Sequence, residues 1–379
     1  MQYKKILSLA VASVVSAQNP NLTEALGSQN SSLSSFSDLL SSNPELANSL
    51  NNLRNVTILA PSNDALNSLT SDHNTLMEYT QSGYLRALLD YHVLNGTYHN
   101  TSFTNESVFI HTALENSTYS NITGGQVVEA RLVDNNVTFF TALKQNASIV
   151  TPNVNFTGGT IHIIDSLLHI PQNISDTLSN SNLTAAEGAI IQANLTDTII
   201  GDHNVTIFAP NNDAFEAIGS IIGNLSSDDL VSIVGYHVIN GSVNYSTNLR
   251  NSTANAINGR ELTITVENGT VWVNSAKVTV PDILIENGVV HVIDGVLNPN
   301  NTSAAPDTAA TSATAAFSGA SSGTNGVPFT SGVATATTTF PAATSAGGSS
   351  SSKGAAMPMK TGAVGAAALF GGAAVIVNL

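Results

Sequence analysis

The chain contains 379 residues, with 26 acidic and 11 basic side chains, a formal charge of −15 and no cysteine. An acidic surface disfavours nucleic-acid binding, which depends on Lys and Arg side chains that neutralise phosphates. Without cysteine the protein can form neither a disulfide, nor a thiolate zinc site, nor a thiol nucleophile. Its domains must be stabilised by their hydrophobic cores alone, so they cannot be very small.

The amino-terminal residues have the features of a secretory signal peptide. Lys4 and Lys5 precede an uncharged apolar run over residues 6–15, and a small-residue cleavage site ends at Ala17. The apolar run is shorter than the roughly 20 residues that a membrane-spanning helix needs. We therefore expect residues 1–17 to be a signal peptide that is removed from the mature protein.

A twelve-residue segment occurs twice in nearly the same form. The first copy, "NVTILAPSNDAL", begins at Asn55, and the second, "NVTIFAPNNDAF", begins at Asn204. In each copy a short apolar strand ends at the proline, and the polar residues after it can cap a helix. Asp64 and Asp213 then occupy the first helical turn, where a negative charge is favourable. The repetition predicts duplicated scaffold rather than a catalytic site that is present twice.

An amphipathic helix and a Tyr-His pair follow in each copy. Apolar residues recur with helical spacing at positions 85, 88, 89 and 93, and again at 230, 233, 234 and 238. Tyr91-His92 and Tyr236-His237 lie on these stripes. The two histidines could be acid–base groups or metal ligands, or they could be core side chains held by hydrogen bonds. Their position on the apolar stripe favours the core role.

The later part of each copy has the pattern of antiparallel strands. Leu262, Ile264 and Val266 alternate with polar residues, and Asn268-Gly269 is a strong hairpin turn signal. The first copy has Asp134-Asn135-Asn136 at the matching turn. The single tryptophan, Trp272, lies on the strand after the turn, on the face opposite its two valine neighbours. It is either a glycan-stacking residue or a partly covered surface aromatic.

A third repeated motif closes each copy. His162 precedes Asp165 by three positions, and His291 precedes Asp294 by the same spacing. In a strand, residues three apart point to opposite faces, so neither pair is expected to form a His–Asp couple. A structural role is again favoured.

These landmarks divide the chain into two α+β domains, residues 18–171 and 172–299, each with helices at the front and antiparallel strands towards the back. The first copy carries about 20 extra residues, mostly between Tyr98 and Asn121, which we expect to form a surface loop.

The carboxyl-terminal part predicts a stalk and a lipid anchor. Residues 300–354 are rich in Ser, Thr, Ala and Gly, and cannot bury enough apolar surface to offset chain entropy, which is typical of a disordered, O-glycosylated stalk. Small residues, a short spacer and an apolar tail then follow in the order of a glycosylphosphatidylinositol (GPI) signal. We expect attachment at Gly354, with Ser350 to Ser352 as alternatives, and removal of residues 355–379.

Asn-x-Ser/Thr sequons are dense between Asn21 and Asn301, as expected for a heavily glycosylated surface. The candidate N-glycosylation sites that accompany the repeated landmarks and their loops are Asn55, Asn95, Asn105, Asn136, Asn204, Asn240 and Asn268.

The three motifs resemble those of the fasciclin domain family, in particular "NVTIFAPNNDAF", "YHVIN" and "NGVVHVIDGVLNP". The resemblance covers nearly all of residues 22–299 in two copies. It implies an antiparallel β-sandwich-like wedge with helices packed at one side, and extracellular adhesion rather than catalysis. The order of domains, stalk and anchor looks like that of fungal cell-surface fasciclin-like proteins.

The resemblance also suggests a weak binding segment. In animal relatives an integrin-binding segment resembling "EPDIM" precedes the rear motif. Pro281, Asp282 and Ile283 match it, whereas Val280 and Leu284 replace the Glu and Met. The first copy has Pro152-Asn153-Val154 there, without the aspartate. Pro281, Asp282, Ile283 and Trp272 are therefore weak candidate binding residues.

Together these features predict a non-catalytic, GPI-anchored extracellular glycoprotein that mediates cell adhesion or cell-wall and matrix contact, without cofactor or metal. The expected partners are cell-wall polysaccharide, a matrix or cell-surface glycoprotein, and the membrane through the lipid anchor, but not nucleic acid. Two alternatives remain: an enzyme that modifies wall polysaccharide through paired carboxylates, and a passive structural coat whose glycans matter more than its protein surface.

Overall fold

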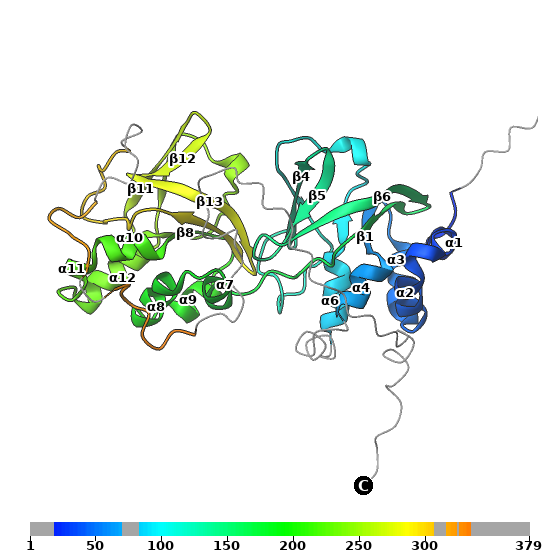
Figure 1. Ribbon diagram of the computed structural model, residues 1–379, viewed down its shortest axis with the longest axis horizontal. Coiled ribbons are helices and arrows are strands. Elements are labelled where there is room, and N and C mark those ends of the chain that lie inside the picture. Colours follow the sequence, from blue (N-terminus) through cyan, green and yellow to red (C-terminus); the bar gives the residue numbers. More distant parts are fainter. Residues whose placement is uncertain (1–18, 70–82, 307–315, 324–325, 335–379) are drawn as a thin grey trace, which may run out of the picture.

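The computed structural model describes residues 19–69, 83–306, 316–323 and 326–334. It contains two α+β domains of the same topology, called domain 1 and domain 2 below, that lie side by side along the molecule (Figure 1). In each domain the helices gather on one side, drawn below the strands in Figure 1, as the sequence predicts. The signal peptide and the Gly354 attachment site fall outside the described residues.

Domain 1 begins with three helices and contains a seven-stranded sheet of order β2-β1-β7-β6-β5-β4-β3. Its elements are α1 (Leu22–Ser28), α2 (Asn30–Ser41), α3 (Pro44–Asn52), β1 (Val56–Pro61), α4 (Asn63–Leu69), α6 (Tyr84–Tyr91), β2 (Val93–Asn95), the 3-10 helix η1 (Asn100–Ser102), β3 (Val108–His111), β4 (Val127–Val133), β5 (Asn136–Phe140), β6 (Asn146–Phe156) and β7 (Gly159–Ile164).

Domain 2 repeats this plan with a sheet of order β10-β11-β12-β13-β14-β8-β9. Its elements are α7 (Ile174–Asn180), α8 (Thr184–Gln192), α9 (Thr196–Gly201), β8 (Val205–Pro210), α10 (Asn212–Ala217), α11 (Gly219–Ile222), α12 (Ser227–Tyr236), β9 (Val238–Ile239), η2 (Ser246–Asn248), β10 (Ser252–Asn255), β11 (Glu261–Glu267), β12 (Thr270–Val273), β13 (Ala276–Ile285) and β14 (Gly288–Ile293).

The twelve-residue repeat supplies a central strand of each sheet. Every residue of β1 and of β8 is buried, and each strand ends at its proline, as predicted. Most strand pairs are antiparallel, but β1 pairs in parallel with β7 and β8 in parallel with β14. Between the two strands of each parallel pair the chain runs through helices and through the other strands of the sheet. The first strand of each domain therefore lies beside the last strand of the same domain.

Polar residues after the proline tie the helices together. Ser62 and Asn211 accept a hydrogen bond from a backbone N–H in the first turn of α4 and α10. Asn63 and Asn212 each use the side-chain oxygen to accept a backbone N–H from a preceding helix, that of Ser35 in α2 and that of Ala185 in α8. The motif thus begins one helix and fixes it against another.

The helix that carries each Tyr-His pair is shorter than its apolar stripe predicts. It ends at Tyr91 in domain 1 and at Tyr236 in domain 2, and the histidine is the C-terminal cap residue. The next residue already belongs to β2 or β9. The predicted hairpin turns are confirmed, since Asp134, Asn135, Asn268 and Gly269 all have positive φ between paired strands.

About half of the extra residues of the first copy lie in the connection from β3 to β4, which overlaps the later part of the predicted segment. This connection spans residues 112–126, whereas domain 2 has only residues 256–260 between β10 and β11. This connection is more than a surface loop, because its end forms hydrogen bonds to domain 2, as described below.

Part of the predicted stalk has a defined place. Residues 316–323 and 326–334 run along α8, α10 and α11, in orange in Figure 1. The physical reason is that this low-complexity region contains a few large apolar side chains, among them Phe317, Val327 and Phe329, which pack onto the core of domain 2. We found no helix among the described residues that is long and apolar enough to cross a membrane.

Candidate functional site

The two Tyr-His pairs are built into the cores. His92 Nδ1 lies 2.7 Å from the Leu88 carbonyl oxygen and therefore donates to it, while Nε2 accepts from the Leu168 N–H at 3.0 Å. His237 repeats both contacts with Ile233 and Leu297. Both rings use one N–H donor and one lone pair, which requires the neutral form.

Burial reinforces this protonation state. It lowers the pKa of His92 and of His237 to about 4, although the carbonyl hydrogen bond opposes the shift. The tyrosines of the two pairs also form hydrogen bonds with the backbone of distant strands. The Tyr91 hydroxyl donates to the Val127 carbonyl oxygen at 3.0 Å, and that of Tyr236 to the Glu261 carbonyl oxygen at 2.7 Å. Each pair thus joins a helix end to one distant strand, β4 or β11, and to the segment that follows the last strand of the domain.

A second pair of histidines holds a bulge in the long strands β6 and β13. His162 Nδ1 accepts from the Asn153 N–H, and its Nε2 donates to the Tyr98 carbonyl oxygen. His291 does the same with the Asp282 N–H and the Asn244 carbonyl oxygen. Burial lowers the pKa of both histidines, so they too are neutral.

Asn153 and Asp282 occupy equivalent positions in the two domains. Both have a positive φ, of 59° and 62°, where the strand register shifts. Asn153 accepts the Asn100 N–H at the start of η1. The Asp282 carboxylate accepts the Ser246 N–H at 2.7 Å and also the Ser246 hydroxyl, at the start of η2. The side chain at this position therefore caps a 3-10 helix in each domain.

The carboxylates of the rear motif accept hydrogen bonds from the backbone rather than from histidine. Asp165 accepts the Ser148 N–H at 2.8 Å, and Asp294 accepts the Lys277 N–H at 2.7 Å. These contacts differ from those of His162 and His291, as the strand geometry predicts. Asp64 and Asp213 lie in the first turns of α4 and α10.

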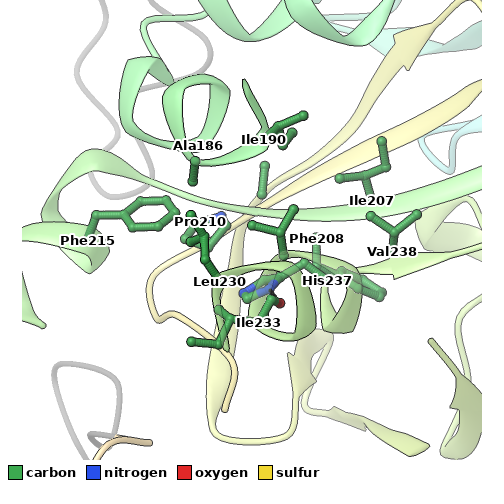
Figure 2. Close-up of a pocket in the computed structure, with 13 residues that line it drawn as sticks. Ala186, Ile190, Ile207, Phe208, Pro210, Phe215, Leu230, Ile233, His237 and Val238 are labelled. Carbon is green, nitrogen blue, oxygen red and sulfur yellow. Dashed lines mark hydrogen bonds between the residues drawn. The ribbon is translucent and has the colours of Figure 1, made fainter. Parts of the chain in front are cut away.

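One cavity of domain 2 is apolar and small. It has a volume of about 30 Å³ and lies between β8, α8, α10 and α12, with His237 as its one polar lining residue. Figure 2 shows Phe208, Phe215 and Leu230 around this space, beside the His237 ring. A cavity of this size holds about one water molecule, not a sugar. Within the described part of the chain no cluster of His, Asp or Glu is placed to bind a metal.

The two domains meet through polar groups of the β3–β4 connection. Gln126 is fully buried, and its side-chain NH2 donates to the carbonyl oxygens of Ile285 and Glu286 in domain 2. The Asn204 amide forms a two-way contact with Thr123, accepting its N–H and donating to its hydroxyl, both at 2.8 Å. The side chains of Gln126 and Asn204 therefore form hydrogen bonds between the two domains, as buried polar groups in folded proteins generally do.

Apolar side chains continue the same junction. Val127 of domain 1 packs with Tyr245, Leu284 and Val289 of domain 2 in one buried cluster. The rings of Phe109 and Tyr245 stack with centroids 4.0 Å apart and planes 10° from parallel. The junction therefore has a buried apolar centre beside hydrogen-bonded amide groups, which favours a defined domain arrangement. The Tyr245 hydroxyl is buried there without a hydrogen-bond partner among the described residues.

The geometry can be compared with known proteins. The fasciclin domain model matches residues 31–171 and 181–299. The chain belongs to the fasciclin domain family. A fasciclin-like arabinogalactan protein of Arthroderma benhamiae is 34% identical over 276 residues, which span 72% of this chain and 66%, just under two thirds, of that protein. One of Phaeosphaeria nodorum is 29% identical, covering 69% and 88%.

A solved structure of a fasciclin domain pair, from the insect cell adhesion molecule fasciclin I, covers 71% of this chain and 97% of its own. Its sequence identity is 20% and its TM-score 0.34.

Within the second fasciclin domain, the segment suggested by the integrin-binding resemblance is not displayed. Asp282 is 2% exposed and Ile283 1% exposed, while Pro281 is half-buried. The expectation that Asp282 contacts a partner directly disagrees with this placement, because its carboxylate already caps η2. The equivalence of Asp282 and Asn153 was not evident from the sequence, because one residue is charged and the other is not. Both side chains accept a backbone N–H at the start of a 3-10 helix.

The capping role makes a specific prediction for Asp282. Asp282→Asn should retain the fold and cell attachment, because Asn153 shows that an amide suffices. Asp282→Ala should lower the free energy of unfolding of the second fasciclin domain by about 1–3 kcal/mol, since the Ser246 N–H loses its acceptor. Denaturation followed by Trp272 fluorescence measures this. Loss of attachment in a fully folded Asp282→Asn protein would instead assign Asp282 to binding.

Trp272 is also covered. It is 6% exposed, on β12 opposite Thr265 of β11 and Lys277 of β13. Its indole N–H has no hydrogen-bond partner among the described residues. Of the two interpretations, the covered aromatic agrees better with this burial than a ring displayed for glycan stacking.

The candidate N-glycosylation sites differ in accessibility. Asn55, Asn95, Asn105, Asn136, Asn240 and Asn268 are exposed, whereas Asn204 is half-buried at the domain junction. Asn55, the counterpart of Asn204, accepts the Thr97 N–H within its own fasciclin domain. Asn55 thus stabilises a turn within the first fasciclin domain, whereas Asn204 in the second contacts the neighbouring domain.

This difference predicts unequal modification. A glycan replaces an Asn side-chain hydrogen and adds bulk, so a glycan on Asn204 would disturb its two-way contact with Thr123. We expect glycopeptide mass spectrometry of the secreted protein to find two exposed asparagines occupied, Asn136 at the start of β5 and Asn268 in the β11–β12 turn, and Asn204 unmodified. High occupancy of Asn204 would show that the two domains do not dock as described.

Proposed function

We propose that the protein is a non-catalytic extracellular glycoprotein that mediates adhesion of a cell surface to cell wall, matrix or another cell. The observation that carries this proposal is the use of the repeated polar motifs. Every motif histidine and the motif carboxylates Asp165, Asp282 and Asp294 form hydrogen bonds with the backbone of their own fasciclin domain. These side chains build a scaffold, so contact with a partner falls to the exposed surface between them.

The layout of the chain supports the same proposal. The signal peptide (residues 1–17) would direct it to the secretory route, and a GPI anchor at Gly354 would hold it on the plasma membrane. Relatives named arabinogalactan proteins agree with a heavily glycosylated surface. Two fasciclin domains on one chain, and many chains on one surface, would give avidity from weak individual contacts.

A binding screen tests the proposal. The secreted chain, with and without enzymatic removal of its N-glycans, is applied to cell-wall polysaccharides, to matrix glycoproteins and to whole cells. Saturable binding that survives deglycosylation is expected, because the protein surface is proposed to make the contact. Binding to none of these materials would overturn the proposal.

The passive coat remains a second candidate, supported by the density of sequons. It predicts that substituting the exposed sequon asparagines abolishes the surface phenotype. The adhesion proposal predicts instead that binding persists once the glycans are removed.

A further inference from the structure

The carboxyl-terminal segment that packs on domain 2, residues 316–334 with 324–325 outside the description, is called the strap here. Its first anchor is Phe317, which is 9% exposed and belongs to the same buried cluster as Ile218 and Leu230. Its second is Phe329, whose ring contacts that of Phe215 edge-on, with centroids 5.8 Å apart. Phe215 also lines the apolar cavity of domain 2.

Two glycines of domain 2 leave room for the strap backbone. A Cβ atom at Gly188, inside α8, would overlap the carbonyl oxygen of Phe329. One at Gly219, the first residue of α11, would lie 2.6 Å from the Cα and N atoms of Gly323. Glycine is unfavourable in the interior of a helix, so its presence at Gly188 is explained by the close approach of another chain segment.

Backbone hydrogen bonds align the strap on this face. The Ser220 N–H donates to the Ser321 carbonyl oxygen at 3.0 Å, and the Ser321 N–H donates to the Ser220 hydroxyl at 2.9 Å. The Gly323 N–H donates to the Glu216 carbonyl oxygen at 3.1 Å. The face thus offers two apolar contacts, with polar pairing between them, to an uncharged, glycine- and serine-containing peptide.

We propose that the α8–α10–α11 face of domain 2 is a peptide-docking groove, and that the strap of the same chain is its occupant. The family match ends at residue 299, so the strap lies outside the domain that the family shares. The sheet of domain 2 is complete at β14, so the strap adds no strand to it and contacts the domain through the helices α8, α10 and α11. The groove is closed to other peptides while the strap is bound.

A competition experiment on the whole secreted chain tests this. A labelled synthetic peptide of residues 316–334 is added to the wild-type chain and to Phe329→Ala, which weakens the strap without altering the groove. The peptide should bind Phe329→Ala at least about tenfold more tightly than the wild type, because the groove is then less occupied. Ser331→Ala, an exposed strap position, is the matched control and should behave like the wild type.

Groove variants complete the test. Adding Gly219→Ala to Phe329→Ala should abolish peptide binding, whereas adding Gly201→Ala, where a Cβ atom meets nothing within 4 Å, should not. Trp272 fluorescence reports whether domain 2 of each variant is folded. Equal binding to wild type and Phe329→Ala, or binding to neither, would overturn the proposal. Dimers of the wild-type chain that the peptide dissociates would show that the occupant is the strap of a second copy, which contradicts the assignment within one chain.

Discussion

Replacing Gly288 by alanine is expected to lower the free energy of unfolding of domain 2 by roughly 3–5 kcal/mol, or to prevent its folding. Gly288 is the first residue of β14 and pairs with Val205 of β8 in the parallel part of the sheet. A Cβ atom there would overlap the Val205 carbonyl oxygen. Both partners are backbone in central strands, so no side-chain rotation can relieve the overlap.

Domain 1 offers the same test at a second position. A Cβ atom at Gly159, the first residue of β7, would overlap the Val56 carbonyl oxygen in the equivalent pair. Gly201→Ala is the matched control, because its Cβ atom meets no neighbour and alanine is the better helix former, so it should be neutral or slightly stabilising. Urea denaturation followed by Trp272 fluorescence measures domain 2. A Gly288→Ala protein as stable as Gly201→Ala would contradict the parallel pairing.

The second large effect is a loss of stability in acid that depends on the buried histidines. The unfolded chain protonates histidine near pH 6.5, whereas burial lowers the pKa of His92 and His237 to about 4 in the folded protein. Between these values the unfolded state binds more protons. The free energy of unfolding must therefore fall as the pH falls, by up to about 3 kcal/mol for each of the two histidines at pH 4.

Other titratable groups also contribute to the pH dependence of the free energy of unfolding. His162, His169 and His291 also have lowered pKa values through burial, and act in the same direction. Burial raises the pKa of Asp90 and Asp294, so these carboxyls take up protons more readily in the folded state and partly oppose the effect.

Substitution of His237 isolates the contribution of this residue to the pH dependence of stability. His237→Gln should be less stable than the wild type at pH 7 but should lose less stability between pH 7 and pH 4.5, because the titrating group is gone. His203→Gln, at an exposed position of domain 2, is the control and should keep the wild-type slope. Denaturation curves at four or five pH values, followed by Trp272 fluorescence, give both slopes. Equal slopes for His237→Gln and the control would show that His237 is not held neutral.

Much of the fold could be predicted from local patterns. The apolar runs around Ile58 and Ile207 predicted the central strands, and Asn268-Gly269 predicted a hairpin because its backbone needs positive φ. The stripes before His92 and His237 predicted helices. Their ends were misplaced, because periodicity alone cannot show that the chain turns into a strand immediately after the Tyr-His pair.

What local patterns could not predict depends on contacts between distant segments. The parallel pairing of β8 with β14 joins residues more than 80 positions apart. The capping of η2 by Asp282 depends on a strand bulge, which leaves no periodic signal. The strap is another case, since Phe317 and Phe329 stand in a low-complexity region that resembles free stalk. One signal was present for it: Gly188 interrupts an otherwise good helix, which indicates close packing.

Three of the candidate binding residues, Asp282, Ile283 and Trp272, are buried, which sequence patterns did not indicate. Asp282 matched a short segment by residue type, and type alone does not report burial. Its counterpart Asn153 was a better guide, because a position that serves the same contact in both copies belongs to the duplicated scaffold. The β3–β4 connection differs between the copies, and in domain 1 it forms hydrogen bonds to domain 2.

Attachment of living cells tests the central claim most directly. Cells that carry the chain, cells that lack it, and cells that carry it with Asp282→Asn are compared for adhesion to wall polysaccharide, to matrix glycoprotein and to other cells. Loss of the chain should lower attachment to at least one of these surfaces, and the Asp282→Asn chain should restore it fully. Normal attachment of cells that lack the chain to every surface would contradict a role in adhesion.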